Sequence, residues 1–162
     1  MEKLIVTATD KADVYREILP QIENVITGES NLIANLANVS AILKEAFDLF
    51  WVGFYLVDRE SDGNVLVLGP FQGPLACTRI AFGRGVCGTA WKRKETVVVE
   101  DVEKFPGHIA CSSLSRSEIV VPCFGKEGEV EAVLDIDSKE LSTFDKVDAE
   151  FLQKVVELLF KG

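Results

Sequence analysis

Both ends of the chain carry apolar residues at every third or fourth position, the spacing that predicts amphipathic helices. Three helices are expected on this ground, over residues 10–26, 30–47 and 144–160. Their expected caps are Asp10, Ser30, and Ser142 or Thr143. Pro20 lies inside the first pattern, where its ring and missing N–H predict a kink or break. Residues 1–7, ahead of that helix, are expected to form a loose tail.

The middle of the chain has a different pattern, with short apolar runs rich in aromatic and β-branched residues, which is typical of strands. Six strands are expected, over residues 50–57, 64–68, 76–82, 96–100, 118–124 and 130–136. Gly69-Pro70 and Gly73-Pro74 are expected to break the chain, and a short helix is expected over 86–94. Strands joined by hairpins, and not by long helices, predict an α+β fold with an antiparallel sheet.

One long segment, residues 102–116, is polar and fits neither pattern. A loop of more than about 12 residues without structure of its own is usually functional or disordered. We therefore expect the terminal helices on one face of the sheet and this loop, with the active site, on the other. At 162 residues the chain is expected to form a single domain, residues 1–162.

Charge and composition narrow the possible functions. Seventeen Lys and Arg against 26 Asp and Glu give a formal net charge of −9. Such a surface repels nucleic acids and anionic membranes, since both bind clusters of Lys and Arg. No apolar run approaches the about 20 residues of a membrane span, and residues 1–7 lack the features of a signal peptide. The chain is therefore expected to be cytoplasmic, with neither nucleic acid nor membrane as a partner.

Four cysteines are the first candidates for chemistry, because cytosolic disulfides tend to be catalytic or redox-sensing. Cys111 lies in the long polar loop, where a thiol is poorly explained as core. Cys77 begins a short strand beside a loop, a plausible position for the partner of another thiol. Cys87 opens the short helix, whose free N–H groups favour a thiolate, although packing explains it equally well. Cys123, in an apolar strand, is expected to be a buried hydrophobe.

Carboxylates form a second group of candidates. Asp135 and Asp137 alternate in an apolar strand, so both side chains point to one face, where they are costly unless they bind something. Glu118, at the start of the preceding strand, is expected to join them. Asp101 ends another strand, and a solvated strand-end acid is the alternative for each of these residues. No cysteine pair has the Cys-x-x-Cys spacing and His108 is the only histidine, so no metal site is expected.

Seven strings of residues, in the same order, resemble the free methionine-(R)-sulfoxide reductase family, which is built on a GAF domain. They are WVGFY at 51–55, LGPFQG at 68–73, ACTRI at 76–80, GRGVCGTA at 83–90, GHIAC at 107–111, SEIVVP at 117–122 and LDIDS at 134–138. The resemblance covers roughly residues 31–159. It implies a GAF-like sheet of about six strands.

The resemblance also implies roles for individual residues. Cys111 corresponds to the nucleophile, Cys77 to the main resolving cysteine and Cys87 to an auxiliary one. The expected proton donors are Glu118 and Asp137. The expected substrate-binding residues are Trp51, which would pack on the methyl end of the substrate, Tyr55, Asp101 and Asp135.

The implied activity is reduction of free methionine (R)-sulfoxide by thiol chemistry. The nucleophile becomes a sulfenic acid, a second thiol converts it to a disulfide, and thioredoxin returns the thiols. No metal or organic cofactor is expected, and a homodimer is an open expectation. Acidic neighbours raise the pKa of a thiol, so the substrate's ammonium is expected to neutralise a carboxylate. A non-catalytic GAF sensor of a small ligand and a peroxide-sensing thiol protein remain the alternatives.

Overall fold

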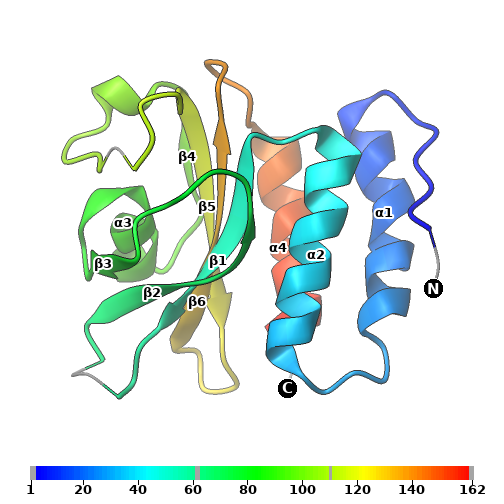
Figure 1. Ribbon diagram of the computed structural model, residues 1–162, viewed down its shortest axis with the longest axis horizontal. Coiled ribbons are helices and arrows are strands. Elements are labelled where there is room, and N and C mark those ends of the chain that lie inside the picture. Colours follow the sequence, from blue (N-terminus) through cyan, green and yellow to red (C-terminus); the bar gives the residue numbers. More distant parts are fainter. Residues whose placement is uncertain (1–2, 61–62, 110, 161–162) are drawn as a thin grey trace.

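A single antiparallel sheet organises the computed structural model, which describes residues 3–60, 63–109 and 111–160 (Figure 1). Its six strands lie in the order β3-β2-β1-β6-β5-β4. Their bounds are β1 Trp51–Val57, β2 Val65–Gln72, β3 Arg79–Ala81, β4 Val97–Val99, β5 Ser117–Phe124 and β6 Val130–Ser138. The helices are α1 Lys11–Ile26, α2 Leu32–Phe47, α3 Gly85–Arg93 and α4 Lys146–Phe160, with a 3₁₀ turn η1 at Val102–Lys104. The predicted α+β class and the predicted order of elements are confirmed.

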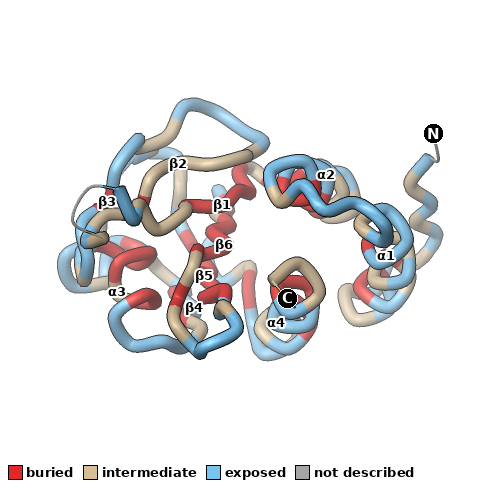
Figure 2. The backbone as a smooth tube through the Cα atoms, turned by 90° about the horizontal axis from the view of Figure 1, so that it is seen from below, coloured by how far each residue is buried: buried red, intermediate tan, exposed pale blue. Residues whose placement is uncertain are grey.

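The two faces of the sheet are covered differently (Figure 1). Helices α2 and α4 lie against one face with α1 outside them, and α3 and the 102–116 segment lie on the other. This is the predicted arrangement, and it leaves the central strands buried on both sides (Figure 2). The side chains of β5 show the alternation: Ile119 and Cys123 belong to the core on the helix side, and Val120 to the core on the loop side. Cys123 is therefore the buried hydrophobe that the sequence predicts.

The helices begin and end slightly differently from expectation. Helix α1 runs unbroken through Pro20, whose ring is exposed, so water can reach the carbonyl group that the missing N–H leaves unpaired. Asn31, and not Ser30, caps α2 by accepting the N–H of Ala34 at 3.0 Å. Asp145 precedes α4 and accepts the N–H of Val147 at 2.9 Å, so Ser142 and Thr143 are not its caps. No helix among the described residues is both long and apolar enough to cross a membrane.

The prediction of a loose N-terminal tail is wrong for the described residues from Lys3 onward. Leu4 and Val6 pack against the helix-side core. Thr7 donates its N–H and its hydroxyl to the Glu17 carboxylate at 2.7 and 2.6 Å. Local periodicity could not predict this docking, because its partners lie on α1, ten or more residues away.

The prediction that Gly69-Pro70 breaks the chain is also wrong. Strand β2 continues to Gln72, and its pairing with β1 shifts register between Gly53 and Tyr55. The shift is a β-bulge, which has room for an unpaired residue and so tolerates a proline that lacks a hydrogen-bond donor. The next strand, expected over 76–82, is only three residues long. The segment that joins β2 to β3 is therefore not part of a strand and can extend over the loop face of the sheet.

Candidate active site

Three acidic side chains meet on the loop face of the central strands. Glu118 of β5 lies directly opposite Asp137 of β6, and Asp135 lies on the same face two residues earlier. Strand β1 places Trp51 opposite Asp137 and Gly53 opposite Asp135. Glu118 and Asp135 are buried, and Asp137 is partly exposed. The strand alternation in the sequence therefore predicts this cluster correctly.

Burial raises the pKa of all three carboxyl groups, and those of Glu118 and Asp137 lie well above their usual values. The charge of Asp135 raises the pKa of Glu118 and Asp137 further. Hydrogen bonds from Glu118 and Cys87 to Asp135 act in the opposite direction on Asp135. These hydrogen bonds favour the ionised form of Asp135, whereas the charge of Asp135 disfavours ionisation of its two neighbours. One oxygen of Asp135, Oδ1, is buried without a hydrogen-bond partner.

Cys87 lies next to this cluster of acidic residues, in the first turn of α3. Its Sγ and one oxygen each of Glu118 and Asp135 lie within 4.8 Å of one another, the one group of three potential metal ligands among the described residues. The sequence leaves open whether the helix N-terminus activates Cys87 or whether the residue serves packing, and the structure buries its side chain. Burial, followed by the charge of Asp135, raises the pKa of the Cys87 thiol well above its usual value.

The structure joins Cys77 and Cys111 in a disulfide. Their Cα atoms are 5.4 Å apart, although 34 residues separate them in sequence. Cys111 is exposed in the long loop and Cys77 is half-buried in the segment before β3. The link therefore connects the two loops that cover the carboxyl cluster. Cys87 and Cys123 are free thiols.

A small cavity lies between this disulfide and the carboxyl cluster. Its walls include Trp51, Tyr55, Cys111 and the three acidic residues. Its volume of about 40 Å³ leaves room for a few water molecules, since each needs about 10–15 Å³ of such space. In the disulfide form, the cavity between the two loops and the sheet therefore has little free volume.

The aromatic wall holds the Cys77 segment in place. The Tyr55 hydroxyl donates to the carbonyl oxygen of Cys77 at 2.9 Å, and the Trp51 indole N–H donates to that of Pro74 at 3.0 Å. The two rings stack with their centroids 6.0 Å apart. Strand β1 thus supplies an apolar wall and also fixes the loop that carries one half of the disulfide.

One expected site residue does not line this cavity, and one residue that does line it was not expected. Asp101 does not line it, because its carboxylate caps η1 by accepting the N–H of Glu103 at 3.1 Å. His108 does line it, with Nε2 3.8 Å from Oε1 of Glu118. Burial lowers the pKa of His108, so the pair is not an ion pair at neutral pH. In the sequence, the one sign that His108 belongs to the site is its position three residues before Cys111.

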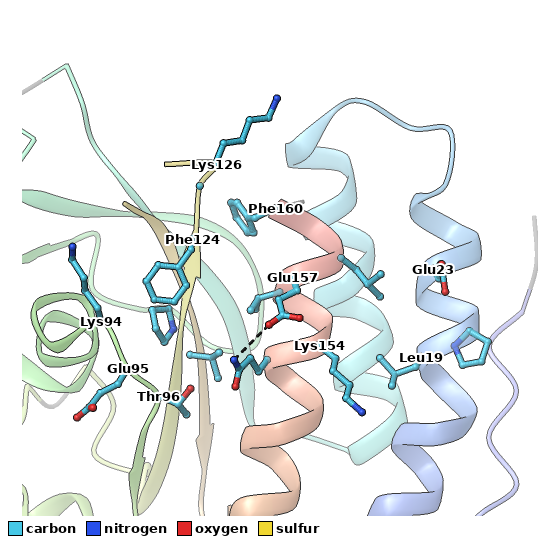
Figure 3. A pocket seen from close by; sticks show the side chains of 17 residues that line it. Leu19, Glu23, Lys94, Glu95, Thr96, Phe124, Lys126, Lys154, Glu157 and Phe160 are labelled. Atoms are coloured by element: carbon cyan, nitrogen blue, oxygen red, sulfur yellow. Dashed lines mark hydrogen bonds between the residues drawn. The ribbon is translucent and has the colours of Figure 1, made fainter. Parts of the chain in front are cut away.

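A much larger groove than this cavity lies elsewhere in the described structure (Figure 3). It has a volume of about 960 Å³ and runs between α4 and the strand edge, where Phe124 and Phe160 face it. Lysines and glutamates rim it, including Lys94, Lys154 and Glu157 (Figure 3). None of the predicted site residues lines this groove. The small cavity is therefore the candidate active site.

Comparisons with known proteins point to one family. A GAF domain family model matches residues 31–159. The X-ray structure of free methionine-R-sulfoxide reductase from Neisseria meningitidis in complex with its substrate matches with a TM-score of 0.96 and 60% identity, over 99% of this chain and 95% of that one. The free methionine-R-sulfoxide reductase of Saccharomyces cerevisiae is 45% identical over 158 residues, 94% of this chain and 87% of its own. That of Escherichia coli is 44% identical over 153 residues, 94% and 90% of the two chains.

The raised pKa of Glu118 predicts a pH-dependent effect of the Glu118→Gln substitution on stability. Wild-type stability falls as pH rises from the unfolded-state pKa of Glu118 through its higher folded-state pKa, because ionisation in the folded protein is penalised. Gln keeps the shape and cannot ionise. The variant should therefore gain stability relative to the wild type between about pH 5 and pH 8, by on the order of 1 kcal/mol or more. Urea unfolding at the two pH values measures the difference.

Glu150→Gln, at an exposed position on α4, is the matched control and should show no such trend. An equal stability difference between Glu118→Gln and the wild type at both pH values would contradict the raised pKa.

Proposed function

The chain belongs to the GAF-domain family of free methionine-R-sulfoxide reductases, and from that premise we propose that it reduces free L-methionine (R)-S-oxide to L-methionine through its own thiols. The observation that carries the proposed chemistry is the disulfide between Cys77 and Cys111 over a cavity walled by three carboxyl groups. A non-catalytic sensor has no need for such a pair. The enzyme is an oxidoreductase, and the steps below use residues of this chain alone.

The first step is attack by the Cys111 thiolate on the sulfoxide sulfur. The sulfur–oxygen bond breaks, the oxygen ends on Cys111 as a sulfenic acid, and methionine leaves. Cys111 is exposed on its loop, whereas Cys87 is buried, and burial together with the nearby acidic residues raises the pKa of the Cys87 thiol. This position supports Cys111 as the thiol that ionises for attack, since the thiolate is the nucleophile.

The sulfoxide oxygen must receive a proton in this step, and Asp137 is the proposed donor. Its carboxyl group is kept protonated by burial and by the charge of Asp135. Glu118 has a raised pKa too, but its proton is engaged in a hydrogen bond to Asp135. Asp137 is also the least buried of the three, which supports contact with substrate. A neutral Asp137 can thus give its proton where the negative charge develops.

Substrate recognition uses opposite ends of the same cavity. The substrate ammonium would pair with the carboxylate of Asp135, whose Oδ1 has no hydrogen-bond partner. The methyl group on sulfur would rest on Trp51 and Tyr55, whose rings form the apolar wall. Ammonium binding offsets the acidic field that would otherwise oppose a thiolate nearby.

The second step regenerates a closed disulfide. The Cys77 thiol attacks the Cys111 sulfenic acid, water leaves, and the sulfur–sulfur bond forms. Cys87 is the proposed auxiliary resolving thiol, in addition to Cys77. The oxidised cavity of about 40 Å³ is far smaller than the about 300–1,000 Å³ of typical ligand sites. We therefore take reduction of the disulfide, by thioredoxin and without a metal or organic cofactor, to precede the next substrate.

The free amino acid should be reduced far better than a sulfoxide within a peptide. An internal residue carries no ammonium, so it would leave the Asp135 charge unpaired in a buried site, which costs several kcal/mol. Methionine formation with thioredoxin, thioredoxin reductase and NADPH, from free methionine (R)-sulfoxide and from a tripeptide with the sulfoxide in the middle, measures this. Comparable efficiency on both compounds would overturn the recognition argument. Oxidation by peroxide without turnover of either sulfoxide would favour a peroxide sensor.

The cysteines should separate into three behaviours. Cys111→Ser should release no methionine even in a single turnover. Cys77→Ser should complete one turnover but lose cycling with thioredoxin, because the sulfenic acid has lost its main partner. Cys123→Ser is the control and should retain activity, since its side chain lies in the core on the other face of the sheet. Rapid quench, with methionine quantified by chromatography, distinguishes these outcomes, and single-turnover activity in Cys111→Ser would rule out this nucleophile.

Asp137→Asn should slow single-turnover methionine release by at least about tenfold, at the low end of the range for a positioned acid. The substitution keeps the size of the side chain and removes its proton. A circular dichroism melt checks that the variant is folded, and Glu118→Gln in the same assay is the matched comparison. A folded Asp137→Asn enzyme that reacts at the wild-type rate across pH would transfer the acid role to Glu118 or to water.

A further inference from the structure

Large exposed apolar residues lie close in sequence to both cysteines of the disulfide. Leu75 is 89% exposed and stands two residues before Cys77. Ile109 is 37% exposed, two residues before Cys111, and Leu114 is 56% exposed, three residues after it. Single exposed apolar residues are ordinary, but the disulfide brings these two segments together, and exposed apolar residues that gather in one region often mark interaction sites. We call Leu75, Ile109 and Leu114 the disulfide rim.

The disulfide rim belongs to two segments that the fold holds together. Leu75 and Ile109 line the cavity that Cys111 also lines. The side chain of Ile109 sits against Gly85 at the start of α3, close enough that a Cβ on that glycine would meet it at 3.1 Å. Trp51 fixes the Leu75 side through its hydrogen bond to Pro74. The rim is therefore presented by anchored loops on both sides of the sulfur–sulfur bond.

We propose that the disulfide rim is the docking surface for the reductant, a thioredoxin-class dithiol protein. The inference rests on the proposed function, which needs an external two-electron donor after every turnover. A protein thiolate can reach this bond only by contact with the surface around it, and that surface is apolar. Redox partners typically meet over less than about 1,200 Å² in total, so a rim of a few side chains is sufficient.

The exchange follows from which cysteine is accessible. Cys111 is exposed and Cys77 is half-buried, so the partner's thiolate attacks Sγ of Cys111. The Cys77–Cys111 bond breaks, Cys77 leaves as a thiolate and takes up a proton, and Cys111 is held in a mixed disulfide. The partner's second thiol then attacks its own first sulfur. This releases reduced Cys111, and the partner leaves oxidised with the two electrons removed from it.

The main test replaces Leu114, which does not line the cavity. Leu114→Asp should raise the KM for thioredoxin at least about tenfold, because the apolar contact of the leucine side chain with the partner is replaced by a charge that must be desolvated. Turnover with the small dithiol dithiothreitol, which needs no docking surface, should stay within about twofold of the wild type. For Leu75→Asp, the ratio of thioredoxin to dithiothreitol efficiency should fall in the same way. Ile33→Asp is the matched control, 52% exposed on α2 at the other face of the sheet.

An unchanged KM for thioredoxin in both rim variants, or an equal loss in Ile33→Asp, would overturn the proposal. Equal efficiency of dithiothreitol and thioredoxin with the wild type would do so as well, because the reductant then needs no surface.

A second measurement keeps this result apart from the fate of the proposed function. Thioredoxin whose second cysteine is replaced by serine should trap the oxidised enzyme as a mixed disulfide in the absence of any sulfoxide. Leu114→Asp should slow the trapping at least about tenfold, and peptide mapping should find the partner on Cys111. Trapping without sulfoxide reduction would leave the docking surface standing and the substrate wrong. A wild-type rate of trapping in Leu114→Asp, or a link through Cys77, would overturn the docking surface or the order of attack respectively.

Discussion

Three carboxyl groups on one buried face of the central strands are the constraint on which the rest of the site depends. Glu118, Asp135 and Asp137 lie on paired strands, and no Lys or Arg is among the described residues that line their cavity. Such a cluster cannot be fully ionised away from water, so protons are shared within it and its pKa values rise. The same shortage of positive charge makes the cavity suited to a ligand that brings an ammonium group of its own.

The three thiols differ in their position relative to the acidic cluster. Cys87 lies against the acids and is held in its neutral form by burial and by the charge of Asp135. Cys111 is exposed on the loop above the cavity, and the carbonyl oxygen of Cys77 accepts a hydrogen bond from the Tyr55 hydroxyl. The disulfide between them lies over the cavity and is presented on the outside, where a reductant can reach it.

Packing on the opposite face explains why this site stays in place. The strands that carry the acids also bury Ile119, Leu134 and Ile136 against the helices. Within the buried helical layer, the Tyr15 hydroxyl of α1 donates a hydrogen bond to the Asp148 carboxylate of α4 at 2.6 Å. The Lys11 ammonium group donates to the same carboxylate at 2.7 Å. Packing against the helices therefore fixes the register between β1, β6 and β5. A one-residue slip of a strand would turn the acidic side chains into the apolar core.

The sequence by itself determined the elements, the two faces of the sheet, and the position of Asp135 and Asp137 on one face, because these depend on residues two to four apart. The ordered motifs also indicated the family and the roles of Cys77 and Cys111. Only the tertiary structure decided the rest: it joined two cysteines 34 residues apart, left Asp101 outside the lining of the cavity and placed His108 in that lining. It also distinguished the two interpretations of Cys87 that the sequence left open, since a helix N-terminus favours a thiolate locally while burial and nearby acids raise the pKa of the thiol. Spacing along a chain encodes local geometry, whereas burial and long-range charge exist only once the chain has folded.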